Sequence, residues 1–174
     1  MYIHETQNWP DFTWNREQID AKLIKVSKAA GYLEGRLSAI GFDVQQQAAV
    51  EALTYDIVSS SEIEGVLLNS DQVRSSVARR MGVHITNETE PSHYIEGVVE
   101  MMMDAVNNYS SPLTDERLFG WHNCLFPTGR SGMEPINVGQ YRVDPMDVVS
   151  GTLGREKVHY HAPAAEDVPA EMQR

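Results

Sequence analysis

The sequence predicts a mainly α-helical fold that ends in a short β-hairpin. Up to about residue 125, apolar residues recur at steps of three and four, the spacing of amphipathic helices. After Pro127 this period is lost. Residues 128–165 are rich in glycine and proline and contain the β-type runs QYRV and KVHYH, with DVV between them. This part is too short to build a sheet with its own core, so we expect a hairpin or flap.

The first helix is expected over residues 16–40 and stops near Gly41. Its apolar positions alternate between steps of four and three, which places them on one face: Ile19, Leu23, Val26, Ala30, Leu33, Leu37 and Ile40. The seven-residue repeat is short. We therefore expect an antiparallel partner helix within the chain rather than a long coiled coil.

Four further helices are predicted before Pro127, and three of them have a recognisable N-cap. The second covers residues 44–64 with Asp43 as its N-cap, and the third opens with Asn69 and Gln72 and ends before Gly82. The fourth covers residues 92–108, and the fifth follows Thr114 as N-cap. The last residues, AEDVPAEMQR, begin one more helix, because a proline is tolerated in a first turn.

Glu64 is the unusual residue of the second helix. Leu53, Ile57, Ser60 and Glu64 follow steps of four, three and four, so the carboxylate continues an apolar stripe. Gly65 is a good C′ residue, which puts Glu64 at the negative end of the helix dipole, at a cost of about 0.3–1 kcal/mol unless a cation is near. The spacing thus implies a partner arginine or lysine, or else an exposed last-turn residue without a role.

Composition excludes several classes of function. Lys and Arg number 14 against 25 Asp and Glu, a net charge of −11, so we expect no nucleic-acid partner. Nor is a membrane partner expected, because the N-terminus lacks a signal-peptide pattern and no apolar run approaches about 18 residues. The single cysteine, Cys124, reads as a small buried hydrophobe. Together these features favour a cytoplasmic protein.

The common catalytic signatures are missing. GxGxxG, the Walker loop, HExxH and GxSxG do not occur. His159 and His161 alternate on a predicted strand and would face the same side, as in a metal pair, but no third ligand has a matching spacing. We therefore expect no metal site. His122, next to Trp121, is interpreted as a packed, hydrogen-bonded residue rather than a base.

Three segments together resemble the Fic family of protein adenylyltransferases. SSEIEG, residues 60–65, resembles the family's inhibitory-helix motif [ST]xxxE[GN]. GQYR (139–142) and REKVHYHAPAAEDVP (155–169) resemble its flap and the segment after it. WNREQIDAKLIKVSKAAGYLEGRLSAIGFD (14–43) is similar to the helical extension before many Fic domains. The resemblance covers nearly the whole chain in the family's order.

The resemblance implies a helical bundle of Fic type with a short β-hairpin flap. Residues 1–110 would be a helical N-terminal extension that includes the inhibitory helix at about 44–65. Residues 111–174 would be the start of a Fic domain, with the flap at about 139–161. In the family, the inhibitory glutamate pairs with the second arginine of the catalytic loop HxFx[DE]GNGRxxR and keeps the γ-phosphate of ATP out of its productive position. Glu64 would be this glutamate, supported by a hydrogen bond from Ser60, and Gly65 would let the chain leave the helix.

The family transfers AMP from ATP, with Mg²⁺, to a Ser, Thr or Tyr hydroxyl of a target protein. The catalytic loop does not occur in the 174 residues, so we expect a truncated chain without catalytic residues that is inactive alone and binds neither ATP nor Mg²⁺ tightly. The resemblance assigns target docking to Gly139, Tyr141, Arg142 and Met146, by strand addition at the flap. For Tyr141 and Arg142 the alternative is a purely structural place in the hairpin.

The implied partners are the target protein and either a second copy in a homodimer or a chain that carries the catalytic loop. A different class of function also fits the helices: a non-catalytic, antitoxin-like module that presents its inhibitory helix to a partner Fic chain. A transcription-associated helical domain is a third reading. The acidic balance and the lack of a basic recognition helix argue against it.

Overall fold

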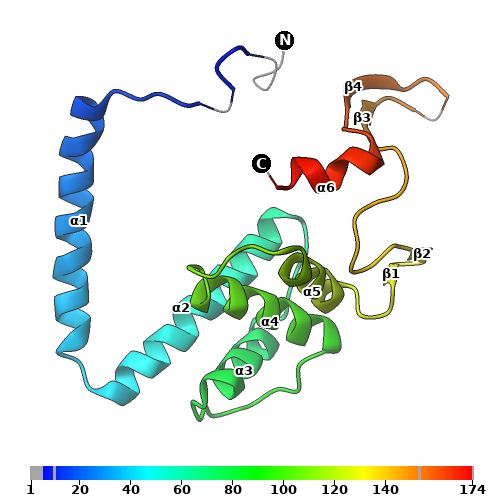
Figure 1. The fold of residues 1–174 in the computed structure, drawn as a ribbon. Helices are drawn as coiled ribbons and strands as arrows, with labels where there is room; N and C mark the ends of the chain where they lie inside the picture. The colour runs from blue at the N-terminus through cyan, green and yellow to red at the C-terminus, as the bar shows by residue number, and fades with distance from the viewer. Residues whose placement is uncertain (1–5, 10, 153, 174) are drawn as a thin grey trace. The chain divides into compact units, whose positions relative to one another are not determined.

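The computed structural model describes residues 6–9, 11–152 and 154–173. The described chain is mainly helical and carries two small antiparallel hairpins, which confirms the predicted fold class (Figure 1). By its internal contacts the chain divides into two compact units, Met1–Ala49 and Val50–Arg174. No helix of the described residues is both long enough and apolar enough to cross a membrane.

The first unit contains α1 (Arg16–Ser38) and the beginning of α2 (Phe42–Ile63). Asn15 caps α1 by accepting the backbone N–H of Gln18 at 3.1 Å. Helix α1 is thus present as predicted, yet none of its residues is buried, and Leu33 on the apolar stripe is 58% exposed. The antiparallel partner for this stripe stays a prediction.

The start of α2 differs from the expectation. Asp43 was predicted as the N-cap, but it lies inside the first turn, where its charge suits the positive end of the helix dipole. The carbonyl of Gly41 instead accepts the backbone N–H groups of Val44 and Gln45. The side chain of Gln45 also reaches back to the carbonyls of Ile40 and Leu37, at 2.6 and 3.0 Å. The helix therefore starts at the backbone of Gly41, a residue without a capping side chain, and the cap signal at Asp43 was misleading.

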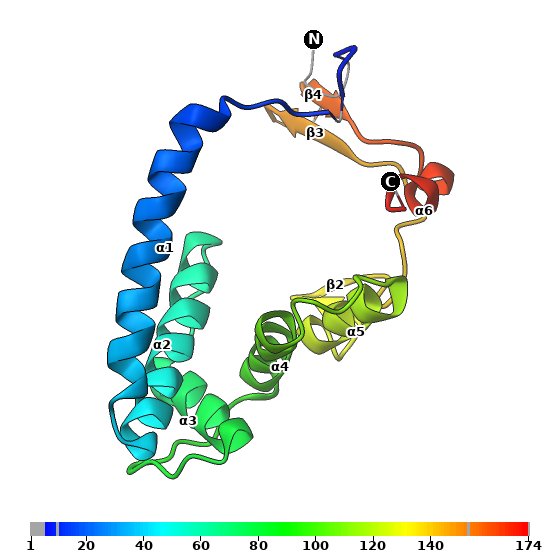
Figure 2. The same ribbon diagram turned by 60° about the vertical axis from the view of Figure 1, so that its left-hand side comes forward.

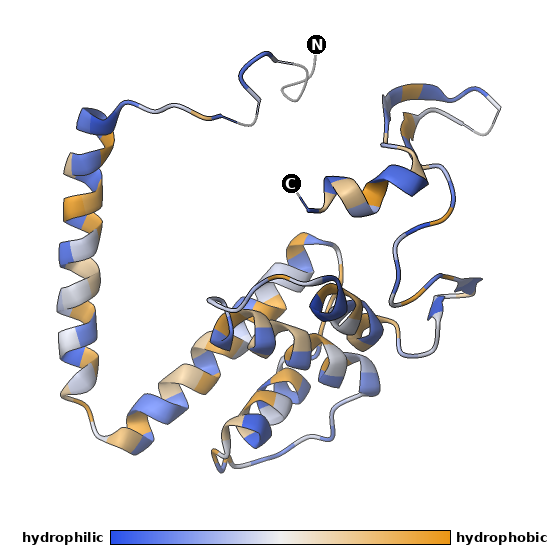
Figure 3. Ribbon diagram, in the orientation of Figure 1, coloured by the Kyte–Doolittle hydropathy of each residue, from blue (hydrophilic) through white to orange (hydrophobic). Residues whose placement is uncertain are grey.

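The core of the second unit is formed by α2, α3 (Ser70–Met81) and α4 (His93–Asn107). Figure 3 shows hydrophobic and hydrophilic residues alternating around these helices, as expected for one buried face each. The fully buried apolar side chains are small and mostly β-branched: Val50, Ile57, Val73, Val77, Ala78, Ile95, Val98 and Val99. The cap predicted at Asn69 is present, and the structure adds a cap at Ser92; each side chain accepts a backbone N–H three residues ahead.

Helix α5 (Asp115–Leu125) lies beside α4, and Figures 1 and 2 both show this pairing. The two helices approach closely at Gly97, where a Cβ atom would lie 1.9 Å from the carbonyl oxygen of Cys124. Thr114 caps α5 as predicted and accepts the N–H of Arg117 at 3.2 Å. Helix α5 is therefore packed against α4, and residues after Pro127 can in turn contact α5.

The remaining elements are short. β1 (Arg130–Ser131) pairs with β2 (Glu134–Pro135), a hairpin that was not predicted, and β3 (Asp147–Ser150) pairs with β4 (Lys157–His161). The runs DVV and KVHYH are therefore strands, whereas the predicted strand QYRV is wrong. No strand of the described chain pairs with QYRV, because its tyrosine turns toward α5 instead. The 3₁₀ turn Ala165–Asp167 and α6 (Val168–Glu171) follow, with Pro169 in the first turn of α6 as predicted.

Candidate functional site

The end of α2 places Glu64 at the helix C-cap. The N–H of Gly65 donates to the carbonyl of Glu62 at 2.9 Å, and the N–H of Val66 donates to that of Ser61 at 2.8 Å. These two bonds, with a φ of +79° at Gly65, form a Schellman motif in which Gly65 is the C′ residue, as predicted. A residue with a Cβ atom would be strained there. The turn therefore stops the helix with the Glu64 carboxylate at its negative end.

Glu64 borders an open hollow of about 220 Å³ between the end of α2 and the helices α4 and α5. The stripe predicted on α2 runs from the core to this rim, since Ile57 is 1% exposed while Ser60 and Glu64 are exposed. The opposite wall is apolar, apart from one hydroxyl, and consists of Tyr94, Val98, Met101, Met102 and Leu125. The carboxylate thus lies at the edge of a largely apolar surface.

The Glu64 carboxylate makes no hydrogen bond or ion pair within the described residues, and no basic residue lies in the last turn of α2. The cation that the dipole argument requires is therefore absent from this part of the chain. Ser60 lines the same hollow, but no hydrogen bond joins its hydroxyl to the Glu64 carboxylate among the described residues. The structure brings Ser60, Glu64 and Gly65 together at one helix end, and their inhibitory role stays a proposal.

The second group of candidate residues lies in what we call the hairpin segment, residues 139–163. Gly139 has a φ of +68°, and its N–H donates to His122 Nδ1 at 3.3 Å. The Tyr141 hydroxyl donates to Asp115 Oδ1 at 2.6 Å, and its ring meets Phe119 edge-on with centroids 5.0 Å apart. The hydrogen bond to Asp115 raises the pKa of Tyr141, because it favours the protonated phenol.

Arg142 ties the two legs of the hairpin segment together. Its Nη1 donates to the carbonyl of Asp144 at 2.8 Å, and its Nη2 donates to the carbonyl of Pro163 on the other leg. A backbone bond from Ala162 to the carbonyl of Met146, at 3.0 Å, closes the same end. Met146 itself is 58% exposed. Of the predicted docking residues, Tyr141 and Arg142 use their polar atoms within the chain, whereas the side chain of Met146 is open to a partner.

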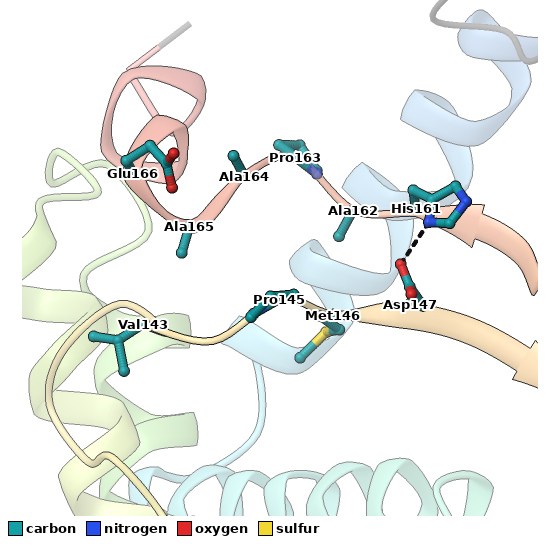
Figure 4. Close-up of a pocket in the computed structure, with 10 residues that line it drawn as sticks. All are labelled: Val143, Pro145, Met146, Asp147, His161, Ala162, Pro163, Ala164, Ala165 and Glu166. Atoms are coloured by element: carbon teal, nitrogen blue, oxygen red, sulfur yellow. Dashed lines mark hydrogen bonds and ion pairs between the residues drawn. The ribbon is translucent and has the colours of Figure 1, made fainter.

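A hollow of about 490 Å³ lies where the two legs meet (Figure 4). Its lining is mixed: Val143, Pro145 and Met146 lie on one leg and residues 162–165 on the other, with the polar side chains of Asp147, His161 and Glu166 beside them. At one end His161 Nδ1 lies 2.8 Å from Asp147 Oδ1, and Figure 4 shows this pair bridging the strands. Such a hollow can receive an apolar side chain.

The register of β3 and β4 corrects the prediction that His159 and His161 face the same side of the strand. Val148 pairs with Tyr160 and Val149 with Val158, so His159 is an extra residue in β4. This bulge interrupts the alternation of faces. His161 lies with Asp147, whereas His159 contacts Ser150, whose side chain is on the opposite face. Among the described residues, no group of three or more His, Cys, Asp or Glu side chains is arranged to hold a metal ion.

Asp104 is the centre of a polar cluster that the sequence did not indicate. It accepts hydrogen bonds from Arg117 Nε at 2.7 Å, Trp121 Nε1 at 2.8 Å and Asn108 Nδ2 at 2.7 Å. The bonds from Arg117, Asn108 and Trp121 lower its pKa to about 2. The guanidinium also stacks on the Trp121 ring, 4.8 Å from its centroid. This cluster joins α4 to α5 and has a structural role.

Cys124 is less buried than its interpretation as a small buried hydrophobe implies. It is partly buried beside Gly97, and burial, with the nearby Glu100, raises its pKa. The thiol is therefore kept neutral, which argues against a nucleophile.

Residues 2–83 match a family model described as Domain of unknown function (DUF4172). The matched region contains α1, α2 and α3, and so includes Ser60, Glu64 and Gly65, but the description carries no activity. No curated protein sequence matches the chain.

Proposed function

We propose that this chain is the N-terminal part of an autoinhibited, Fic-type protein adenylyltransferase in which Glu64 is the inhibitory residue. One observation carries the proposal: a helix-terminal carboxylate without a partner in the described chain stands at the rim of an open apolar hollow. The SSEIEG resemblance supplies the missing cation, the second arginine of a Fic catalytic loop. A glutamate and an arginine can form a bidentate, charge-assisted pair.

The inhibition follows from this pairing. An arginine whose donors face Glu64 cannot also bind the γ-phosphate of ATP, so the nucleotide would bind in a position that does not react. Burial of the pair against Tyr94 and Met102 would strengthen it, since less water would screen the charges. Ser60, which lines the same hollow, is placed to support the carboxylate when the loop is present.

The proposed reaction transfers AMP from ATP, with Mg²⁺, to a hydroxyl of a target protein. The base, the acidic magnesium ligand and the anion-binding glycines would belong to the HxFx[DE]GNGRxxR loop, which the 174 residues do not contain. This chain would contribute the inhibition of AMP transfer, through Glu64, and the contact with the target protein, through the hairpin segment. We expect no AMP transfer by the 174 residues alone.

The test compares variants in a chain that also carries the loop. Glu64→Gly and Glu64→Gln should raise AMP transfer from labelled ATP to protein, because both free the arginine. Glu62→Gln is the matched control, since Glu62 is exposed on the same helix end and lies outside the hollow. Equal transfer by wild type and both Glu64 variants would refute the inhibitory role.

A second candidate is inhibition of another chain. It is favoured by the exposure of Glu64, because a carboxylate that is open to solvent can meet an arginine of a separate protein. In that case the 174 residues would suppress AMP transfer when added to a loop-bearing chain that lacks its own inhibitory helix. The Glu64→Gln variant, added at the same concentration, should not suppress it. Absence of suppression by the wild-type chain would leave inhibition within one chain as the proposal.

A further inference from the structure

The hairpin segment is attached to one face of α5. Its contacts on α5 are Asp115, Phe119 and His122, which are spaced by four and three and so share a helical face. Tyr141 meets Asp115 through its hydroxyl and Phe119 through its ring, while Gly139 meets His122 through its backbone N–H. The attachment therefore has a polar, an aromatic and a backbone contact within three residues of the segment.

The approach at Gly139 is close as well as left-handed. A Cβ atom there would lie 2.7 Å from Asn123 Nδ2, so no larger residue fits without moving α5 side chains. The positive φ turns the chain at Gly139, the point where its backbone contacts α5. Tyr141, two residues later, then fixes the direction in which the segment continues.

We propose that Asp115 is a positioning residue which, through Tyr141, sets the orientation of the hairpin relative to α5. The inference rests on the proposed function only in taking the hairpin as the surface that meets a target protein. Arg142 directly follows Tyr141 and donates to the carbonyls of Asp144 and Pro163, one on each leg. Because Arg142 holds both legs, a Tyr141 fixed on α5 also fixes the orientation of β3 and β4 relative to α5. Tyr141 and Arg142 act by holding the hairpin in place, and the target contacts fall to exposed residues such as Met146.

The test is hydrogen exchange on the 174-residue chain, with Tyr141→Phe, Asp115→Ala and Asp115→Asn. The amides of Gly139 and Ala162 should exchange on the order of fivefold faster in Tyr141→Phe and Asp115→Ala, which is the effect of losing one ordinary hydrogen bond. Asp115→Asn keeps a carbonyl acceptor and should restore much of the protection. Combining Tyr141→Phe with Asp115→Ala should add little, because both changes remove the same bond. Tyr109→Phe is the matched control, since Tyr109 is 83% exposed.

Two results would overturn the positioning role. One is wild-type exchange at Gly139 and Ala162 in both Tyr141→Phe and Asp115→Ala. The other is equally faster exchange in the core of α4, around Val98 and Val99, because that would show general destabilisation. In a loop-bearing chain the same variants should raise KM for the target protein and leave kcat unchanged. If that chain transfers no AMP at all, the proposed function fails, while the exchange result still decides the attachment.

Discussion

Gly97→Ala is the sharpest test of the packing between α4 and α5. In the structure the added Cβ would lie 1.9 Å from the carbonyl oxygen and 2.8 Å from the carbonyl carbon of Cys124. Both are backbone atoms, so no side-chain rotation relieves the clash. The helices would have to separate by roughly 1 Å or more to restore an ordinary contact, in a core packed at crystal-like density. The separation would also stretch the bonds from Arg117 and Trp121 to Asp104.

The magnitude is the balance of two opposing effects. Overpacking of this kind costs typically 1–3 kcal/mol, whereas alanine is favoured over glycine inside a helix by about 0.8–1 kcal/mol. Because the clash is with backbone, we expect the upper part of the range and a net loss of about 2 kcal/mol. For a chain of this size that lowers Tm by roughly 4–8 °C. Urea and thermal unfolding, followed by circular dichroism, would measure it.

The control is Gly120→Ala in α5. Gly120 is also inside a helix, but no heavy atom outside its own helix backbone lies within 4 Å of the position of its Cβ. This variant should gain up to about 1 kcal/mol from helix propensity alone. A Gly97→Ala protein as stable as wild type would refute the close approach. A Gly120→Ala protein as unstable as Gly97→Ala would show that the loss of stability does not come from the close packing of α4 on α5.

Three further expectations concern stability. The pKa of Asp104 is lowered to about 2, so its contribution is present above the unfolded value near 4 and is lost as the pH falls toward 2. The stability difference between wild type and Asp104→Asn should therefore shrink from pH 5 to pH 2, and a constant difference in acid titrations would contradict the hydrogen-bonded carboxylate. Ile57→Ala, at a side chain 1% exposed, should cost about 2–5 kcal/mol in urea unfolding, against less than about 0.5 kcal/mol for Ile63→Ala, which is 83% exposed. Asn69→Ala should lower stability by about 1 kcal/mol through loss of the α3 cap, and a neutral result would place the start of α3 elsewhere.

The helices were predictable because their signals are local. The predicted caps at Asn69 and Thr114 and the C′ glycine at Gly65 act within a few residues, and the structure contains all three. The failures came where local signals compete. Asp43 resembled a cap, although the helix begins one residue earlier, and QYRV had strand propensity, although Tyr141 binds α5. For QYRV a contact with a distant helix decided the conformation, whereas at Asp43 the competing bonds to the carbonyls of Gly41 and Ile40 are themselves local.

The sequence by itself determined the mainly helical class, most helix starts, the hairpin strands DVV and KVHYH, and the position of Glu64 at a helix end. These features depend on hydrophobic periodicity and helix capping, which are determined by residues close together in the sequence. Only the tertiary structure decided that Glu64 lacks a cation within the described chain, that a bulge separates His159 from His161, and that Asp115 holds Tyr141. Each of these features depends on contacts between residues that are far apart in the sequence. Such contacts leave no pattern in the local sequence around either residue.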